Sequence, residues 1–347
     1  MKTSWCSFGL FWLGLNLAFP AESKDSTISN ITDVGESFSI SETYQPGDTF
    51  MDARLLGAVR LRASKVKGEK PRELSGLAWD HDENVLLAVS DDGFIVHLNP
   101  IISNGVLTDL DLIAVYPLLD SNGEKLVKDK TDAEGLVGHN MDNGIAGDSY
   151  ISISFEEHPR VDAYSTDGNF LRSHPLPAIL RAGKNYAGDN QELEALTIHP
   201  ELGLLTAPER PLRNSGTQMF SIYSAAGQTW HYPSLDHQHS ALVGMETTPQ
   251  GNILVLERRF ASMFQPIVFA VRELQLPLDG SKDAKLVREV IKFSSTDGWK
   301  IDNFESVAHH KDNRYFIVSD DNESIFQKTL LVYIEIQDTA TNALMTH

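Results

Sequence analysis

Acidic side chains recur in this sequence within one repeated phrase. The stretch "RELSGLAWDHDENVLLAVSDDG" begins at Arg72, and "DNFESVAHHKDNRYFIVSDDN" begins at Asp302. Both run from an acid through an apolar segment, a polar turn and a second apolar segment to an acidic end. Carboxylate oxygens are preferred ligands of hard cations such as Ca²⁺, and a bound cation can activate water against an ester. The phrase therefore carries residues for metal chemistry, provided that the fold brings its copies together.

Three further copies lie between these two, beginning at Asp132, Gln191 and Ala241. The first acids of the five copies are spaced roughly 50–60 residues apart, and Glu246 is slightly out of register: Glu73, Glu134, Glu194, Glu246 and Glu305. A second set of acids follows the second apolar segment of each copy: Asp91, Asp92, Glu156, Glu157, Glu209, Glu257, Asp320 and Asp321.

The contents of the copies predict an all-β fold, a β-propeller with one copy per four-stranded blade. Each copy holds short apolar runs separated by Asp, Asn and Gly turns, which is typical of antiparallel meanders. The count favours five blades, with six as the alternative if the long copies at Asp132 or Val243 each contain two. The last copy is one strand short. The spare strand at Arg54–Ala63 is therefore predicted to pair with Thr329–Ile336 and to close the ring.

Antiparallel pairing of the inner and second strands would place both sets of acids at one mouth of the central channel. Roughly ten like charges at one mouth need a counter-ion, and Ca²⁺ is the cofactor that this arrangement suggests. The candidate metal ligands are Glu73, Asp91, Asp92, Glu134, Glu156, Glu194, Glu209, Glu257, Glu305, Asp320 and Asp321. Arg210, Arg258 and Arg259 are candidates for binding the anionic part of a substrate, whereas no catalytic residue can be identified.

The same acids have a structural alternative. Each could accept hydrogen bonds from backbone N–H groups of the next blade and so join neighbouring blades. A zinc site at Asp236, His237 and His239 is a weaker alternative, because the spacing supplies no further ligand.

The chain of 347 residues, with a net charge of −19, is expected to bind neither nucleic acid nor an anionic membrane. Residues 1–21 are predicted to be a signal peptide, 22–50 a flexible leader, and 51–347 a single propeller domain. The signal peptide predicts an exported protein, periplasmic or secreted, and no later apolar run is long enough to span a bilayer. The only cysteine, Cys6, lies in the signal peptide. The oligomeric state is not predicted.

Several motifs resemble those of the phytase-like propeller family, whose label is esterase-like activity of phytase. They are "ELSGLAWD" with "VSDDG", "DAEGL" with "FEEHPRV", "LEALTIHP" with "PER", "ILVLERRF", and "NFESVAHH" with "FIVSDDN". The resemblance extends from about Leu55 to Ile336. It implies an exported bacterial β-propeller that hydrolyses phosphoric or carboxylic esters, with a small-molecule ester or phosphate as ligand. The fourth copy departs from the pattern with "LVGMETT", and "EALT" and "ESVA" replace Gly by Ala and Ser, which leaves the number of acidic ligands open.

Two functions follow as hypotheses. The first is metal-assisted ester hydrolysis at the acidic mouth, with Arg258 or Arg210 stabilising the developing negative charge. The second is a Ca²⁺-loaded propeller that binds a ligand or partner without turnover. The fold by itself does not decide between them.

Overall fold

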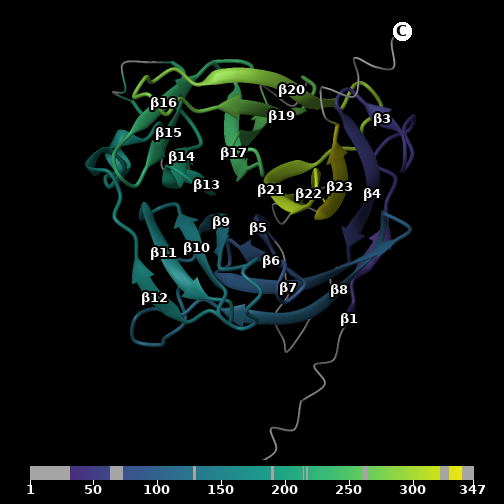
Figure 1. The fold of residues 1–347 in the computed structure, drawn as a ribbon, viewed down its shortest axis with the longest axis horizontal. Coiled ribbons are helices and arrows are strands. Elements are labelled where there is room, and N and C mark those ends of the chain that lie inside the picture. Colours follow the sequence, from purple (N-terminus) through teal and green to yellow (C-terminus); the bar gives the residue numbers. More distant parts are fainter. Residues whose placement is uncertain are drawn as a thin grey trace, which may run out of the picture.

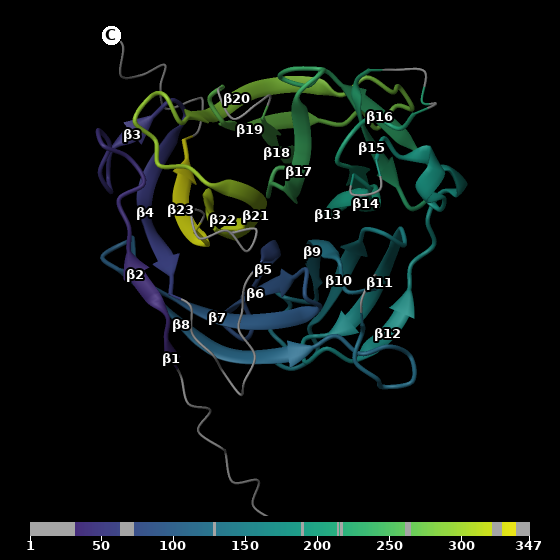
Figure 2. The same ribbon diagram turned by 180° about the vertical axis from the view of Figure 1, so that it is seen from behind.

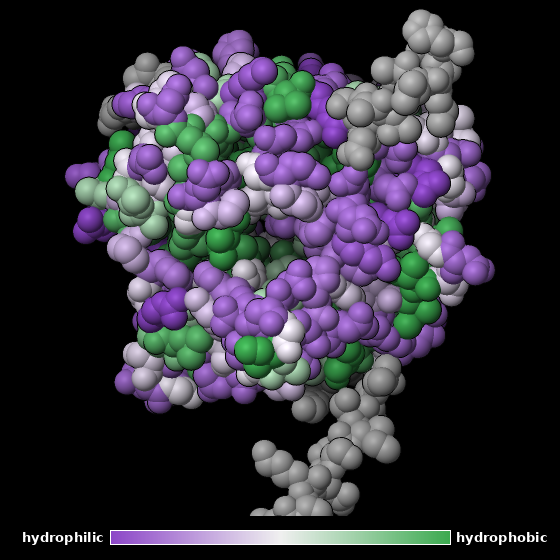
Figure 3. All heavy atoms as spheres, viewed as in Figure 1, coloured by the Kyte–Doolittle hydropathy of each residue, from purple (hydrophilic) through white to green (hydrophobic). Residues whose placement is uncertain are grey.

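The computed structural model describes residues 32–62, 73–127, 130–188, 191–213, 215, 218–260, 265–320 and 328–337. Five antiparallel sheets stand around a central axis as the blades of a propeller (Figures 1 and 2). The predicted all-β fold and the count of five blades are confirmed. One face is largely hydrophilic, with a hollow near its centre (Figure 3).

Each blade is a meander that runs from the channel outward. Blade 1 contains β5 (Leu74–Asp80), β6 (Val85–Ser90), β7 (Phe94–Ser103) and β8 (Val106–Pro117). Blade 2 contains β9 (Ala133–His139), β10 (Tyr150–Phe155), β11 (Arg160–Ser165) and β12 (Phe170–Ser173). Blade 3 contains β13 (Leu193–His199), β14 (Gly203–Pro208), β15 (Phe220–Ser224) and β16 (Thr229–Tyr232). Blade 4 contains β17 (Ser240–Thr247), β18 (Ile253–Arg259), β19 (Val268–Gln275) and β20 (Lys285–Ser294).

Blade 5 is assembled from both ends of the chain. It contains β21 (Asn303–Lys311), β22 (Arg314–Asp320), β23 (Leu330–Ile336) and, as its fourth strand, β4 (Ala53–Leu61). β4 pairs antiparallel with β23, with Arg60 opposite Leu330 and Ala53 opposite Ile336. The predicted closure is therefore confirmed. Pairing with β4 covers the edge of β23 that would otherwise be exposed. An exposed strand edge can pair with another chain, which is a liability for a folded protein.

The prediction of a flexible leader over residues 22–50 is wrong for its second part. Residues 32–50 form β1 (Thr32–Asp33), which pairs with β8, and β2 (Gly35–Ser37) and β3 (Thr49–Phe50), which pair with β4. Val34 and Ile40 within this segment are almost fully buried. These two apolar side chains pack into the core, so the polar composition around them does not keep the segment in solvent. The predicted signal peptide lies outside the described residues.

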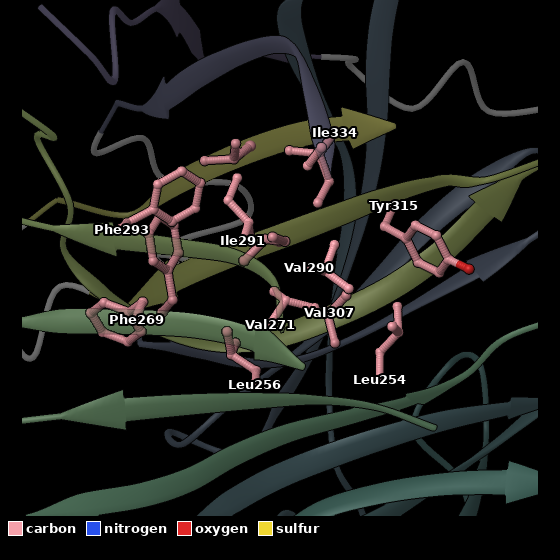
Figure 4. Close-up of a cluster of buried hydrophobic side chains, with 14 of the residues drawn as sticks. Leu254, Leu256, Phe269, Val271, Val290, Ile291, Phe293, Val307, Tyr315 and Ile334 are labelled. Carbon is pink, nitrogen blue, oxygen red and sulfur yellow. The ribbon is translucent and has the colours of Figure 1, made fainter. Parts of the chain in front are cut away.

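Apolar side chains fill the space between neighbouring blades. The largest cluster lies between blades 4 and 5, where side chains from β18, β19 and β20 face those from β21, β22 and β23 (Figure 4). Alternation along each strand sends every second side chain into such a cluster. Within the described residues, no helix is long and apolar enough to cross a membrane.

The five inner strands approach one another closely around the channel. Each of β5, β9, β13 and β17 contacts the next inner strand, and β21 contacts β5. A Cβ atom on Gly76 would lie 2.5 Å from the carbonyl oxygen of Glu134, and one on Gly244 would lie 2.9 Å from that of Glu305. Small residues are therefore required at this position of every blade, and five are found there: Gly76, Gly135, Ala195, Gly244 and Ser306.

The serine in this set has a further function. The backbone N–H of Leu77 donates a 3.1 Å hydrogen bond to Ser306 Oγ, which joins blade 1 to blade 5 in the buried interior. Ser306→Ala would leave this N–H without its partner, and we expect the free energy of unfolding to fall by about 1–3 kcal/mol. Denaturant titration measures the loss, and Ser37→Ala on the exposed part of β2 is the control. Equal stability of Ser306→Ala and the unmodified protein would show that the bond does not support closure.

Candidate functional site

The strand registers align three polar positions of each blade at one end of the channel. The first lies two residues before the register shift of the inner strand, and we call these residues the start set: Glu73, Asp132, Glu192, Ala241 and Asn303. The second lies in the inner strand, and we call these residues the bulge set: Ser75, Glu134, Glu194, Val243 and Glu305. The third lies at the end of the second strand, opposite the start set, and we call these residues the exit set: Asp91, Glu156, Glu209, Arg258 and Asp320.

A β-bulge in every inner strand positions the bulge set. In blade 1 the pairing register shifts between Leu74 and Gly76, and corresponding shifts occur in the other four blades. A bulge leaves one residue outside the ladder and redirects its side chain. The same backbone irregularity therefore occurs five times, and it presents carboxylates in three of the blades.

Five carboxylates from blades 1 to 3 converge, and we call them the acidic group: Asp91, Asp132, Glu134, Glu156 and Glu194. Oxygen atoms of Asp91, Asp132 and Glu134 lie within 4.8 Å of one another. Those of Glu134, Glu156 and Glu194 do so as well, so Glu134 belongs to both triads. Among the residues that the structure describes, no Lys or Arg forms an ion pair with any of the five.

The electrostatics of the acidic group show uncompensated negative charge. Burial raises the pKa of Glu134 well above its usual range, and the carboxylates of Asp91 and Glu194 add to the effect. Burial also raises the pKa of Glu156 from 4.5 to about 8 against a hydrogen bond that lowers it. Without a cation, part of the acidic group would therefore be protonated at neutral pH.

These pKa shifts predict a pH dependence of stability for the cation-free protein. A carboxyl whose pKa is raised on folding stabilises the folded state below its ordinary pKa, and this stabilisation is lost as the pH rises through the folded value. We expect the free energy of unfolding, measured by urea titration with a chelator present, to fall by about 2 kcal/mol or more between pH 5 and pH 8. The decrease should be smaller in excess Ca²⁺, which competes with the protons. A flat profile with chelator would contradict the raised pKa values.

Arg258 pairs with two carboxylates at the same end of the channel, on the side opposite the acidic group. It holds the exit position of blade 4, and its guanidinium donates to Glu209 Oε1 at 3.0 Å and to Glu305 Oε1 at 2.9 Å. Asn303 donates to the same oxygen of Glu305 and accepts a bond from Arg258. Burial alone would lower the pKa of Arg258, but the neighbouring carboxylates outweigh it and raise the pKa. The guanidinium therefore acts as an internal counter-ion for blades 3 to 5.

Glu305 is a further acid next to this counter-ion. Its Oε2 atom is buried and has no hydrogen-bond partner among the described residues. Burial raises the pKa of Glu305 to about 8, although the charge of Arg258 opposes the rise. One arginine thus leaves part of the negative charge at this end unbalanced.

One member of the acidic group also joins two blades. Glu156 Oε1 accepts a 2.6 Å hydrogen bond from the backbone N–H of Glu192 in blade 3. The two interpretations of the repeated acids are therefore not exclusive. At this position the same carboxylate both links the blades and faces the acidic group.

Several predicted site residues lie elsewhere or in a different register. Glu73 belongs to the start set, two residues before the bulge, where Ser75 takes the position equivalent to Glu134 and donates to Asp91. Glu257 is fully buried in an ion pair with Arg272, away from the acidic group. Asp92 follows Asp91, the exit residue of blade 1, and lies half-buried in the turn after β6. Asp321 lies outside the described residues.

The other two predicted arginines bind groups of the protein. Arg210 donates to the carbonyl oxygens of Ser240 and Gln238. Arg259 donates to Asp236 Oδ2 at 3.1 Å, and this carboxylate also contacts His239. Asp236 and His239 are thus held in an ion-pair cluster with Arg259.

Sequence reasoning missed Asp132 as a member of the acidic group. The signal was present, because Asp132 stands two residues before Glu134 as Glu73 stands two before Ser75. Aligning the copies by residue type matched Glu73 with Glu134, whereas the strand register matches Glu73 with Asp132. Asp132 was therefore not recognised as a repeated position. The bulge, which determines the correct match, is not visible in the sequence.

Comparison with known proteins gives one strong match. The model of the phytase-like family, described as "Esterase-like activity of phytase", matches residues 71–323. No curated protein sequence matches the chain.

Two solved structures resemble the chain at low similarity. A structural-genomics protein of unknown function from Bacteroides thetaiotaomicron has 10% identity and a TM-score of 0.39, over 88% of this chain and 76% of that one. U3-55K has 7% identity and a TM-score of 0.36, over 81% of this chain and 98% of that one. Neither likeness bears on function. The family match spans well over half of the sequence and coincides with the blades that build the acidic end, so the protein belongs to the phytase-like family.

Proposed function

We propose that the acidic group binds a divalent cation, with Ca²⁺ as the expected ion, and that the protein hydrolyses phosphate or other esters there. The observation that carries the proposal is the convergence of five carboxylates from three blades with no basic side chain of the described residues paired to them. Ca²⁺ takes six to eight oxygen ligands, and carboxylates are its usual protein ligands. The donor chemistry of the group therefore fits this ion.

The roles of the residues follow from their positions. Glu134, shared by both triads, would contact the ion together with Asp91, Asp132, Glu156 and Glu194. When bound, the cation would polarise an ester oxygen and lower the pKa of an attacking water. Half-buried Asp91 and Glu134 lie closer to solvent than buried Glu156 and Glu194. The solvent side of the ion is thus the side at which an ester would be bound.

A specific observation favours the second candidate, a propeller that binds Ca²⁺ and a ligand without turnover. Arg258 already contacts two carboxylates, and Arg210 and Arg259 are bonded to other groups. In the part of the chain that the structure describes, none of the three predicted arginines is therefore left to stabilise an oxyanion. Catalysis would then rest on the cation alone.

The test is a hydrolysis screen of the purified protein. We expect turnover of p-nitrophenyl phosphate or p-nitrophenyl acetate with Ca²⁺, loss of that turnover with a chelator, and loss in Glu134→Gln. Calcium binding without turnover of any ester would support the second candidate. Turnover that persists equally in chelator and in Glu134→Gln would remove the acidic group from the reaction. We further propose, from the apolar amino terminus, that the protein is exported.

A further inference from the structure

The other end of the channel contains a cavity. A cavity of about 450 Å³ is lined by residues from the far ends of all five inner strands and by the turns that follow them. Small-molecule sites commonly have volumes of about 300–1,000 Å³. None of the residues of the acidic group lines this cavity.

A single carboxyl group distinguishes blade 4 at this end. The residues that follow the repeated apolar position of the inner strands are Ala78, Val137, Thr197, Glu246 and Ala308. Glu246 is thus the one ionisable residue among five equivalent positions. Burial raises the pKa of Glu246 from 4.5 to about 8, although a hydrogen bond from the backbone N–H of His309 opposes the rise. An ammonium group beside it would favour the charged carboxylate. Within the described residues, no basic side chain forms an ion pair with it.

The wall next to blade 2 is held in place by contacts with blade 1. The carbonyl oxygen of Met141 accepts a 2.8 Å hydrogen bond from the backbone N–H of His81. The carboxylate of Asp82 accepts bonds from the N–H groups of Asn143 at 2.9 Å and Gly144 at 3.0 Å. The loop that carries Met141 and Asp142 is therefore fixed before any ligand arrives, which reduces the entropy lost on binding.

The charged residues that line the cavity favour a cationic ligand over an anionic one. Glu246, Asp142 and Asp312 line it together with one lysine, Lys311. His309 is half-buried, and its Nε2 atom contacts the carbonyl oxygen of Asp312 at 2.8 Å. The walls also offer apolar surface for the body of a ligand, from Leu77, Leu136, Val137 and Met141.

A bare metal ion fits this end less well than an organic ligand. Among the described residues, the only triads of His, Asp or Glu with ligand atoms within 4.8 Å of one another belong to the acidic group. Glu246, the carboxyl group on the inner strands, together with the apolar part of the lining instead matches one ammonium group on a hydrocarbon body.

We propose that this cavity is a second binding site, which takes a small organic cation with its ammonium group on Glu246 and its hydrocarbon part on the apolar wall. The inference is independent of the proposed function, because it uses no residue of the acidic group. It gives the propeller two sites at opposite ends of one channel.

The test is calorimetric titration with n-butylammonium at pH 9, where Glu246 is ionised and an alkylammonium group keeps its proton. Saturating Ca²⁺ is present so that the acidic group is already occupied. We expect binding to the unmodified protein and a loss of roughly tenfold or more in Glu246→Gln, which keeps the shape of the side chain and removes its charge. Asp142→Asn, on the exposed rim, should weaken binding by only a few fold. Glu201→Gln, an exposed acid in the turn between β13 and β14, is the control without effect.

Two results would overturn the proposal. The first is the absence of n-butylammonium binding to the unmodified protein. The second is equal binding by Glu246→Gln and the unmodified protein. A loss confined to Glu134→Gln would show that the ammonium ion binds the acidic group instead. Ester turnover in the same preparations reports on the proposed function separately.

Discussion

Calcium is expected to raise the melting temperature of the unmodified protein, and Glu134→Gln is expected to lose most of that rise. A ligand that binds only the folded state stabilises it by about 2.7 kcal/mol at a hundredfold excess over Kd, which corresponds to a shift of about 4 °C for a domain of this size. Glu134 is the sharpest position for this test, because both triads of the acidic group share its carboxylate. Differential scanning calorimetry with Ca²⁺ and with a chelator measures the shift.

Matched variants locate the effect. Glu246→Gln changes a glutamate at the opposite end of the channel and should keep the full Ca²⁺ shift. The double variant Asp91→Asn, Asp320→Asn should lose much of it, since Asp91 contributes directly and Asp320 adds to the charge around Asp91. If the unmodified protein shows no Ca²⁺ shift, the acids serve only to join blades. An undiminished shift in Glu134→Gln would place the cation elsewhere.

Arg258→Met is expected to lower the free energy of unfolding by about 3–5 kcal/mol, because it leaves Glu209 and Glu305 as unpaired buried carboxylates. Methionine keeps much of the side-chain length, so lost packing contributes little. Calcium should restore part of the loss, since the variant would carry carboxylates on every side of the channel end. Urea titration with and without Ca²⁺ measures both effects.

Arg272→Met is the matched control for this rescue. It also breaks a buried pair, because Arg272 contacts the fully buried Glu257, and it should destabilise by a comparable amount. Calcium should not restore the free energy of unfolding lost in Arg272→Met, since Glu257 lies apart from the acidic group. Equal rescue of both variants would mean that calcium acts on the fold in general, and no rescue of Arg258→Met would contradict its role as a counter-ion.

The repeated phrase by itself determined the architecture. Its period of about 50–60 residues, its short apolar runs and its turn residues specify a propeller. The last copy lacks one strand, and a spare strand precedes Glu73. These two features also predicted how the ring closes, because the spare strand can form hydrogen bonds with the open edge of the last blade. These features are local in the sequence or follow from counting. The packed segment 32–50 did not follow, because Val34 and Ile40 are isolated apolar residues in a polar stretch.

The tertiary structure alone decided which acids share the site. Side chains alternate across a strand, so a slip of one residue sends a side chain to the opposite face. Glu257 matches the exit acids by letter, yet the register puts Arg258 in their place and turns Glu257 toward Arg272. The bulges shift the match in blade 1 from Glu73 to Ser75 in the same way. A bulge depends on pairing with the neighbouring strand, so its position cannot be read from the sequence. The sequence therefore could not show which carboxylates at this end of the channel stay unpaired and which ones Arg258 neutralises.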